Sequence, residues 1–149
     1  YVAGIPSVRL FLSSADTPVV DIHAYLTAVA PDGTSRLVSE GILRSSHRKL
    51  GKPPYRNFGL PFPSSLSRDV LTAPPLSPRP VSLEFPMIAV GRVFQRGERL
   101  RLTVAGADQG NVSAPDITSV QTAGLHMGGD TDAWVRLPVL GGIDRSPFE

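Results

Sequence analysis

The sequence contains no cysteine, a single tryptophan and only 7% aromatic residues among its 149 residues. The absence of cysteine excludes a disulfide framework, a thiol nucleophile and a thiolate metal site, and it leaves the compartment unknown, with cytoplasm and secretion both open. No apolar run approaches the roughly 18–20 residues that cross a bilayer, so no membrane partner is expected. The first residues carry neither a start methionine nor a basic leader, which predicts an excised piece of a longer protein.

Charged residues are also few, at 19%, and the net charge of +2 is too small to indicate nucleic-acid binding. The charge is unevenly spread, because residues 41–68 contain no acid. Their six basic residues are Arg44, Arg48, Lys49, Lys52, Arg56 and Arg68. A solvated loop is the commoner meaning of such a run, and a face for an acidic partner is the alternative.

Chain-breaking residues are abundant, with 14 glycines and 15 prolines, and they exclude an all-helical protein. The hydrophobic fraction of 41% is sufficient for a packed core. The length fits one domain, so we expect a single domain over residues 1–149.

The dominant hydrophobic period is two, which is typical of strands with one buried face. It predicts about seven strands, at residues 8–12, 22–28, 35–44, 81–90, 99–104, 119–126 and 134–140. Leu100, Leu102 and Leu137 are expected in the core. Tight turns are predicted at residues 31–33 (PDG), 96–98 (RGE) and 128–130 (GGD), the first joining two strands in a hairpin. This pattern favours an all-β fold, a jelly-roll β-sandwich.

One long connection, residues 49–80, shows no sustained period and contains eight of the prolines. Such a connection is uncommon inside a compact domain and is often functional. Its aromatic residues Tyr55, Phe58 and Phe62 predict that it lies against an apolar surface, such as an interdomain face.

Catalytic patterns are missing. The chain has no Gly-x-Ser-x-Gly elbow, and its histidines, His23, His47 and His126, are scattered, so each is interpreted as a surface or hydrogen-bonded side chain. No His-x-x-x-His pair or phosphate-binding glycine loop occurs. Asp130 and Asp132, and Asp108 with Asn111, are interpreted as turn residues rather than calcium ligands. We therefore predict no metal, no cofactor and no catalytic residue in this chain.

Several segments, in order, resemble the C-terminal domain of the X-Pro dipeptidyl-peptidase and cocaine-esterase (CocE/NonD) group of α/β-hydrolases. They are residues 8–14 (VRLFLSS), 21–22 (DI), 30–33 (APDG), 40–44 (EGILR), 46–48 (SHR), 75–78 (PLSP), 93–102 (VFQRGERLRL), 126–129 (HMGG), 132–134 (DAW) and 137–139 (LPV). Each is weak alone, but their order and spacing cover most of the chain.

The resemblance implies a non-catalytic, galactose-binding-domain-like sandwich in a serine hydrolase, either an acyl esterase or an X-Pro dipeptidyl-peptidase. It implies that the partner is the α/β-hydrolase domain of the same protein, against which the sandwich packs and whose substrate pocket it helps to shape. The Ser-Asp-His triad would belong to that domain, so this chain alone would lack the catalytic triad, and Ser46, His47 and Asp132 match sandwich motifs instead. Tyr55, Phe58, Phe62, Trp134 and His126 are the candidates for the interdomain or pocket face.

Two departures from the family pattern have consequences. Residues 107–111 (ADQGN) stand where many relatives have a longer loop of aromatic residues and proline, so the contact with the substrate pocket that such a loop makes is not expected here. The family domain also starts with one or more strands ahead of Tyr1. A missing N-terminal edge strand would leave an unpaired edge, which predicts a homo-oligomer. The alternative function is a stand-alone carbohydrate- or protein-binding jelly-roll module, with Trp134, Asp130 and His126 near a sugar site.

Overall fold

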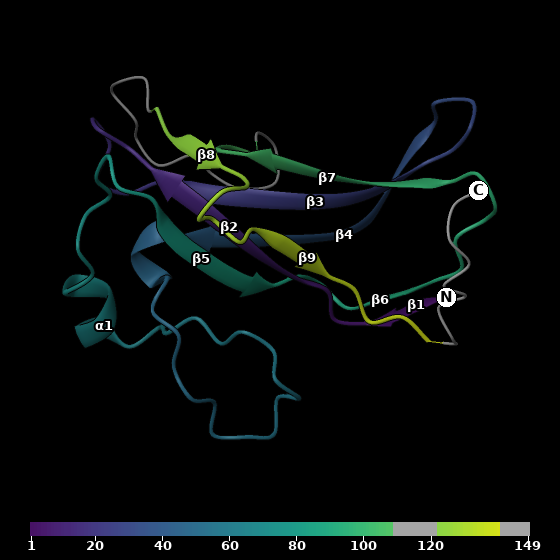
Figure 1. Ribbon diagram of the computed structural model, residues 1–149. Helices are drawn as coiled ribbons and strands as arrows, with labels where there is room; N and C mark the ends of the chain where they lie inside the picture. The colour runs from purple at the N-terminus through teal and green to yellow at the C-terminus, as the bar shows by residue number, and fades with distance from the viewer. Residues whose placement is uncertain (109–121, 141–149) are drawn as a thin grey trace.

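The computed structural model describes residues 1–108 and 122–140, which are built mainly of antiparallel strands (Figure 1). The elements in chain order are β1 (Val2–Gly4), β2 (Ser7–Ser13), β3 (Asp21–Val29), β4 (Ser35–Arg44), the 3₁₀ turn η1 (Ser45–His47), α1 (Ser67–Leu71), β5 (Val81–Pro86), β6 (Val90–Arg92), β7 (Arg99–Ala105), β8 (Gly124–His126) and β9 (Trp134–Arg136). The predicted all-β class is confirmed.

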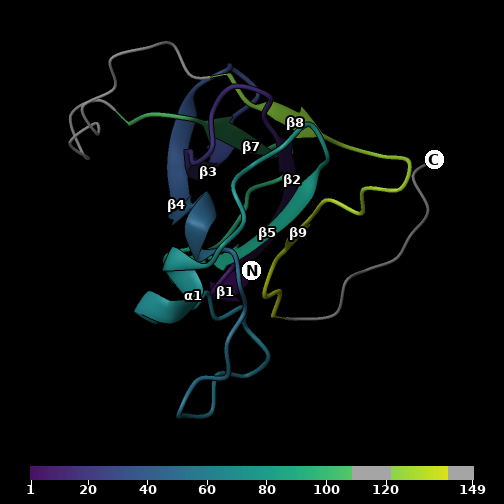
Figure 2. The same ribbon diagram turned by 90° about the vertical axis from the view of Figure 1, so that its left-hand side faces the viewer.

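Two sheets form a β-sandwich, as predicted. One has the order β4-β3-β7. In the other, β5 pairs with one edge of β2, and β8 and β9 divide the opposite edge between them. A third, two-stranded sheet joins β1 to β6, and Figure 2 shows the layers from the side.

The core lies between the two larger sheets and follows the alternation of the sequence. Its residues are Val8, Leu10, Leu12, Val20, Ile22, Ala24, Leu26, Leu43, Leu76, Leu83, Phe85 and Met87. Alternate residues of β2 and β3 supply half of them, because side chains two apart point to the same face of a strand. Val8, Leu83 and Ala24 are completely excluded from solvent.

The β3–β4 hairpin forms at the predicted turn. The backbone N–H of Gly33 donates to the carbonyl of Ala30, Gly33 has φ +88°, and the Asp32 carboxylate accepts a hydrogen bond from the N–H of Thr34. Glycine adopts this positive φ without a side-chain clash, and the aspartate fixes the turn. The turns at Gly97 and Gly128 are likewise confirmed, with φ +88° and +82°.

Several predicted strands differ in extent from those observed. The segment 81–90 divides into β5 and the start of β6, and β1 is an additional strand, so the described residues contain nine strands rather than seven. The last strand ends at Arg136, after which Val139 bridges to Val2. Residues 119–121 of the predicted strand 119–126, and Asn111, lie outside the described residues. The helix α1 interrupts the connection predicted to be irregular.

The prediction that Leu100 belongs to the core is wrong. Leu100 is 38% exposed, whereas Leu102 and Leu137 are partly buried against the core. Leu100 and Leu102 lie on the same face of β7, as the alternation predicts. However, β7 is an edge strand, and Leu100 lies near its end, next to the residue that pairs with Val29, and not over the centre of the sandwich.

We therefore expect Leu102→Ala to destabilise the fold more than Leu100→Ala. Leu102 pairs with the buried Leu26, so its loss should lower the free energy of unfolding by about 1–2 kcal/mol, below the range of fully buried leucines. Leu100→Ala should cost less than about 1 kcal/mol. Urea unfolding of the two variants measures both values, and a larger loss for Leu100→Ala would contradict the observed burial.

The chain that follows β5 crosses β4 at Gly41. A Cβ atom on Gly41 would lie 2.9 Å from the carbonyl oxygen of Pro86 and 3.2 Å from the Cα of Met87. Beyond the crossing, the N–H of Ile88 donates to the carbonyl of Glu40. Glycine at this position therefore lets two backbone segments from different sheets approach closely.

Candidate functional site

The first candidate surface is the loop 48–66 between η1 and α1, which projects away from the sandwich (Figures 1 and 2). Backbone hydrogen bonds join its two limbs: the N–H of Gly51 donates to Phe62, and the N–H of Ser64 donates to Lys49. Leu50 and Pro63 add an antiparallel bridge. The loop is thus a defined structure despite its lack of sequence periodicity.

The three aromatic residues predicted to face a partner lie together in this loop. Tyr55 and Phe62 meet edge to face with ring centroids 6.0 Å apart. Tyr55 is 61% exposed and Phe58 is 80% exposed, and the Arg56 guanidinium lies 5.0 Å from the centre of the Phe58 ring. Phe58 also has φ +54°, a conformation that is rare for bulky residues and persists only where the surroundings impose it.

Asp69 anchors the base of the loop. Its carboxylate is buried in α1 and accepts hydrogen bonds from the Lys49 ammonium and, at 2.7 Å, from the Ser64 hydroxyl. Arg48 donates to the carbonyls of Ser45 and Pro74. Part of the basic run therefore has a structural role, which the sequence alone did not show.

The pKa of Asp69 lies below its ordinary value of 3.8, chiefly because of the hydrogen bond from Lys49 and then that from Ser64, with burial opposing them. A carboxylate whose pKa is lower in the folded state contributes stability above its unfolded pKa and loses it as the pH falls through the folded pKa. We expect Asp69→Asn to destabilise the chain at pH 7, and the difference from wild type to narrow below about pH 4. Denaturant unfolding from pH 7 to pH 3 measures this, with the exposed Asp130→Asn as the control. A difference independent of pH would contradict the ion-pair role.

The other two predicted residues, His126 and Trp134, lie on the outer face of the second sheet. His126 is opposite Phe11, and Trp134 is opposite Arg9, two residues along the same strand. The structure therefore brings His126 and Trp134 to one surface of this sheet. The aromatic loop 48–66 does not belong to the sheet.

Charged groups surround the indole of Trp134. The guanidinium groups of Arg9 and Arg136 lie 5.2 Å and 4.8 Å from the ring centre. Arg9 is held in place by Glu84 at 2.7 Å and by a longer contact with Asp132 at 3.5 Å. A ring that stacks on a sugar needs an open face, so these contacts favour a packing role for Trp134.

His126 has a serine neighbour that the sequence did not indicate. The Ser13 hydroxyl lies 2.7 Å from Nε2 of His126. A hydrolytic triad needs a carboxylate on the other ring nitrogen, and within residues 1–108 and 122–140 no carboxylate is hydrogen-bonded to His126. Diagonal pairing across β2 and β8 accounts for this contact, which sequence spacing could not reveal.

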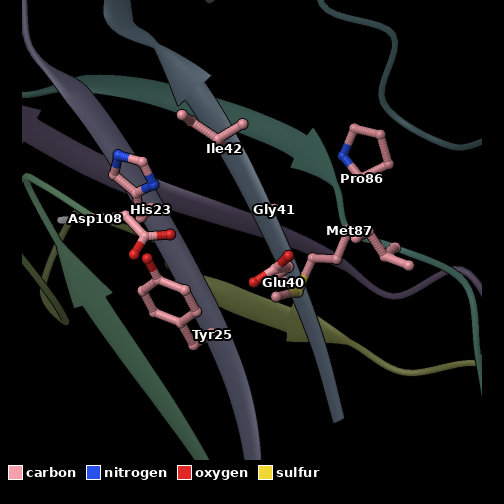
Figure 3. A pocket seen from close by; sticks show the side chains of 9 residues that line it. His23, Tyr25, Glu40, Gly41, Ile42, Pro86, Met87 and Asp108 are labelled. Carbon is pink, nitrogen blue, oxygen red and sulfur yellow. The ribbon is translucent and has the colours of Figure 1, made fainter. Parts of the chain in front are cut away.

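A pocket of about 450 Å³ lies on the outer face of β3 and β4, as Figure 3 shows. His23 and Tyr25 come from β3, Glu40 comes from β4, and Asp108 follows β7. Ile88 belongs to the segment that crosses β4. The prediction of His23 as a surface or hydrogen-bonded residue is corrected, because its side chain is buried, with 5% exposed. Its ring stacks on that of Tyr25, with the ring centroids 6.4 Å apart.

The described residues contain no group of three or more His, Cys, Asp or Glu side chains that could hold a metal ion. In the same part of the chain, no helix is long and apolar enough to span a membrane.

Comparison with known proteins shows that this chain matches a protein family. The family described as "X-Pro dipeptidyl-peptidase C-terminal non-catalytic domain" matches residues 1–128. Two proteins named "Putative serine esterase", from Mycobacterium bovis and Mycobacterium tuberculosis, are each 37% identical over 110 residues, which cover 72% of this chain. The chain spans only 17% of the length of these curated relatives.

Among solved structures, two of a CocE/NonD family hydrolase from Staphylococcus aureus have a TM-score of 0.73 with this chain at 21% identity. They cover 94% and 93% of this chain, which matches 28% of each. This likeness shows the same fold.

Proposed function

The chain belongs to the family of X-Pro dipeptidyl-peptidase C-terminal non-catalytic domains, and from this we propose that it is the β-sandwich of a longer serine hydrolase. In this proposal it packs on the α/β-hydrolase domain of the same protein and helps to shape the substrate pocket. The reaction is acyl-ester or X-Pro peptide hydrolysis, carried out by residues outside this chain.

The observation that carries the proposal is the ordered, exposed aromatic loop 48–66. Phe58 and Tyr55 present apolar surface to solvent, although cross-loop hydrogen bonds and the Tyr55–Phe62 contact hold the loop in shape. An interface anchor with a fixed conformation loses little entropy on binding, and aromatic residues are enriched at the centres of interfaces. Lys52 and Arg56 add positive charge beside it, which suits an acidic surface.

The location of the nucleophile tests the proposal. We would label the full-length protein with a fluorophosphonate and map the modified serine by peptide mass spectrometry. The proposal expects one modified serine outside these 149 residues, within a Gly-x-Ser-x-Gly sequence. A modified serine inside the chain, for instance Ser13, would overturn it.

The docking role of the loop predicts a specific effect of Phe58→Ser in the full-length protein. Loss of an aromatic anchor should speed amide hydrogen exchange in residues 50–62 by about tenfold, because the loop would separate more often from its partner. Leu37→Ser is the matched control, since Leu37 is also exposed, at 57%, but lies on β4 near the hairpin turn. Equal exchange in wild type and Phe58→Ser would show that the loop is not an interface.

A further inference from the structure

The pocket on β3 and β4 combines carboxylates with an apolar wall. Glu40 and Asp108 line it together with Ile42 and Ile88, which are 48% and 60% exposed. None of the described residues that line it is lysine or arginine. Its volume of about 450 Å³ falls in the range of roughly 300–1,000 Å³ that is typical of small-molecule sites. The pocket is therefore a concave site whose permanent charges are negative.

His23 gives an independent indication that the pocket receives a ligand. The His23 side chain is only 5% exposed, and it lines the pocket (Figure 3). Its ring stacks on Tyr25, with 8° between the planes, but has no hydrogen bond to another residue of the described ranges. Its ring nitrogens are not among the fully buried, unpaired polar atoms of the described residues, so at least one of them opens to the pocket and is available to a bound molecule.

Tyr25 adds a hydroxyl next to the carboxylates. Burial, a hydrogen bond donated to Asp108 and the charges of Asp108 and Glu40 raise the pKa of Tyr25 to about 12. The phenol therefore remains neutral at physiological pH, and its oxygen can still accept a hydrogen bond from a ligand. The same charges that disfavour a phenolate would disfavour an anionic ligand.

We propose that this pocket binds an amine or guanidinium group carried on an apolar stem. The cationic group donates to the carboxylates of Glu40 and Asp108, and the Tyr25 hydroxyl oxygen is a further acceptor beside His23. The stem lies against Ile42 and Ile88. The group belongs either to a small free amine or to a lysine or arginine side chain of a partner protein. This site is distinct from the aromatic loop and does not depend on the proposed hydrolase partnership.

Two probes test the proposal and distinguish the sources. Agmatine represents a free cation, and N-acetyl-arginine methylamide represents a side chain within a polypeptide. N-acetyl-norleucine methylamide, which is neutral, is the control ligand. Binding to the chain is followed by calorimetry and by ¹³C-methyl spectra of its two methionines. The Met87 signal, assigned from Met87→Leu, should shift, whereas the signal of Met127, which does not line the pocket, should not.

Glu40→Gln should weaken binding of the cationic probes by about tenfold, because it removes a charged acceptor but keeps the side-chain shape. Asp130→Asn removes an equal charge away from the pocket and should change affinity by less than about twofold. Binding of agmatine alone points to a free amine, and binding of the arginine derivative alone points to a partner side chain. The proposal is overturned if neither cation binds saturably, if the neutral ligand binds equally well, or if Glu40→Gln has no effect. A folded Ile88→Ser variant that binds as wild type would also contradict it.

Discussion

Replacing Phe85 with alanine is expected to lower the free energy of unfolding by about 3–5 kcal/mol, because it leaves a cavity in the centre of the sandwich. Phe85 is 1% exposed and is among the largest fully buried side chains of the described residues. It lies opposite Val8 in the β2–β5 pairing, and Val8 is itself completely buried.

Chemical unfolding followed by far-UV circular dichroism measures the loss. Ser82→Ala on the exposed face of the same strand is the control and should stay within about 0.5 kcal/mol of wild type. A loss below about 1 kcal/mol for Phe85→Ala would mean that the two sheets do not pack through β5.

The parts of the fold that could be predicted are those set by local pattern. The hairpin of β3 and β4 combines a period of two over many residues with a proline, an aspartate and a glycine at the turn. Each of these acts on the chain locally, so the bounds of β4 and the buried face of β3 follow directly from the sequence.

The missed elements are short and depend on distant partners. β1 and β6 have three residues each, too few to show a period, and they pair between distant parts of the chain, with Val2 opposite Arg92 and Gly4 opposite Val90. The helix α1 has five residues and no side-chain cap at Leu66. Its position is set by Asp69, which is tied to Lys49 and Ser64, and such contacts are not visible in a linear pattern.

The candidate sites show the same division. The irregular connection could be predicted because prolines and aromatic residues are concentrated in residues 49–80, whereas the contact of its aromatic residues with a partner surface stays a prediction. The pocket could not, because His23 and Glu40 belong to different strands, and Ile88 and Asp108 reach it only after the chain crosses β4 and leaves β7. His23 also alternates as a polar-face residue, and only the tertiary structure shows that this face is covered at its position.

Gly41→Ala is expected to lower the free energy of unfolding by about 1–3 kcal/mol, although alanine is ordinarily preferred to glycine within a strand. The new Cβ would lie 2.9 Å from the Pro86 carbonyl oxygen and 3.2 Å from the Met87 Cα, and both are backbone atoms that cannot rotate away. The crossing segment would have to move outward, weakening the hydrogen bond from the N–H of Ile88 to the carbonyl of Glu40.

The matched control is Gly106→Ala, which should have the opposite sign. No heavy atom lies within 4 Å of a Cβ at Gly106, and its φ is outside the left-handed region. Alanine there only restricts the unfolded chain and should stabilise the fold by about 0.4–1 kcal/mol. Urea unfolding compares both variants with wild type. Because Glu40 and Ile88 line the pocket on β4, Gly41→Ala should also reduce binding of the cationic probes, whereas Gly106→Ala should leave it unchanged. Equal stability of the two variants would show that β4 and the segment after β5 do not cross at Gly41.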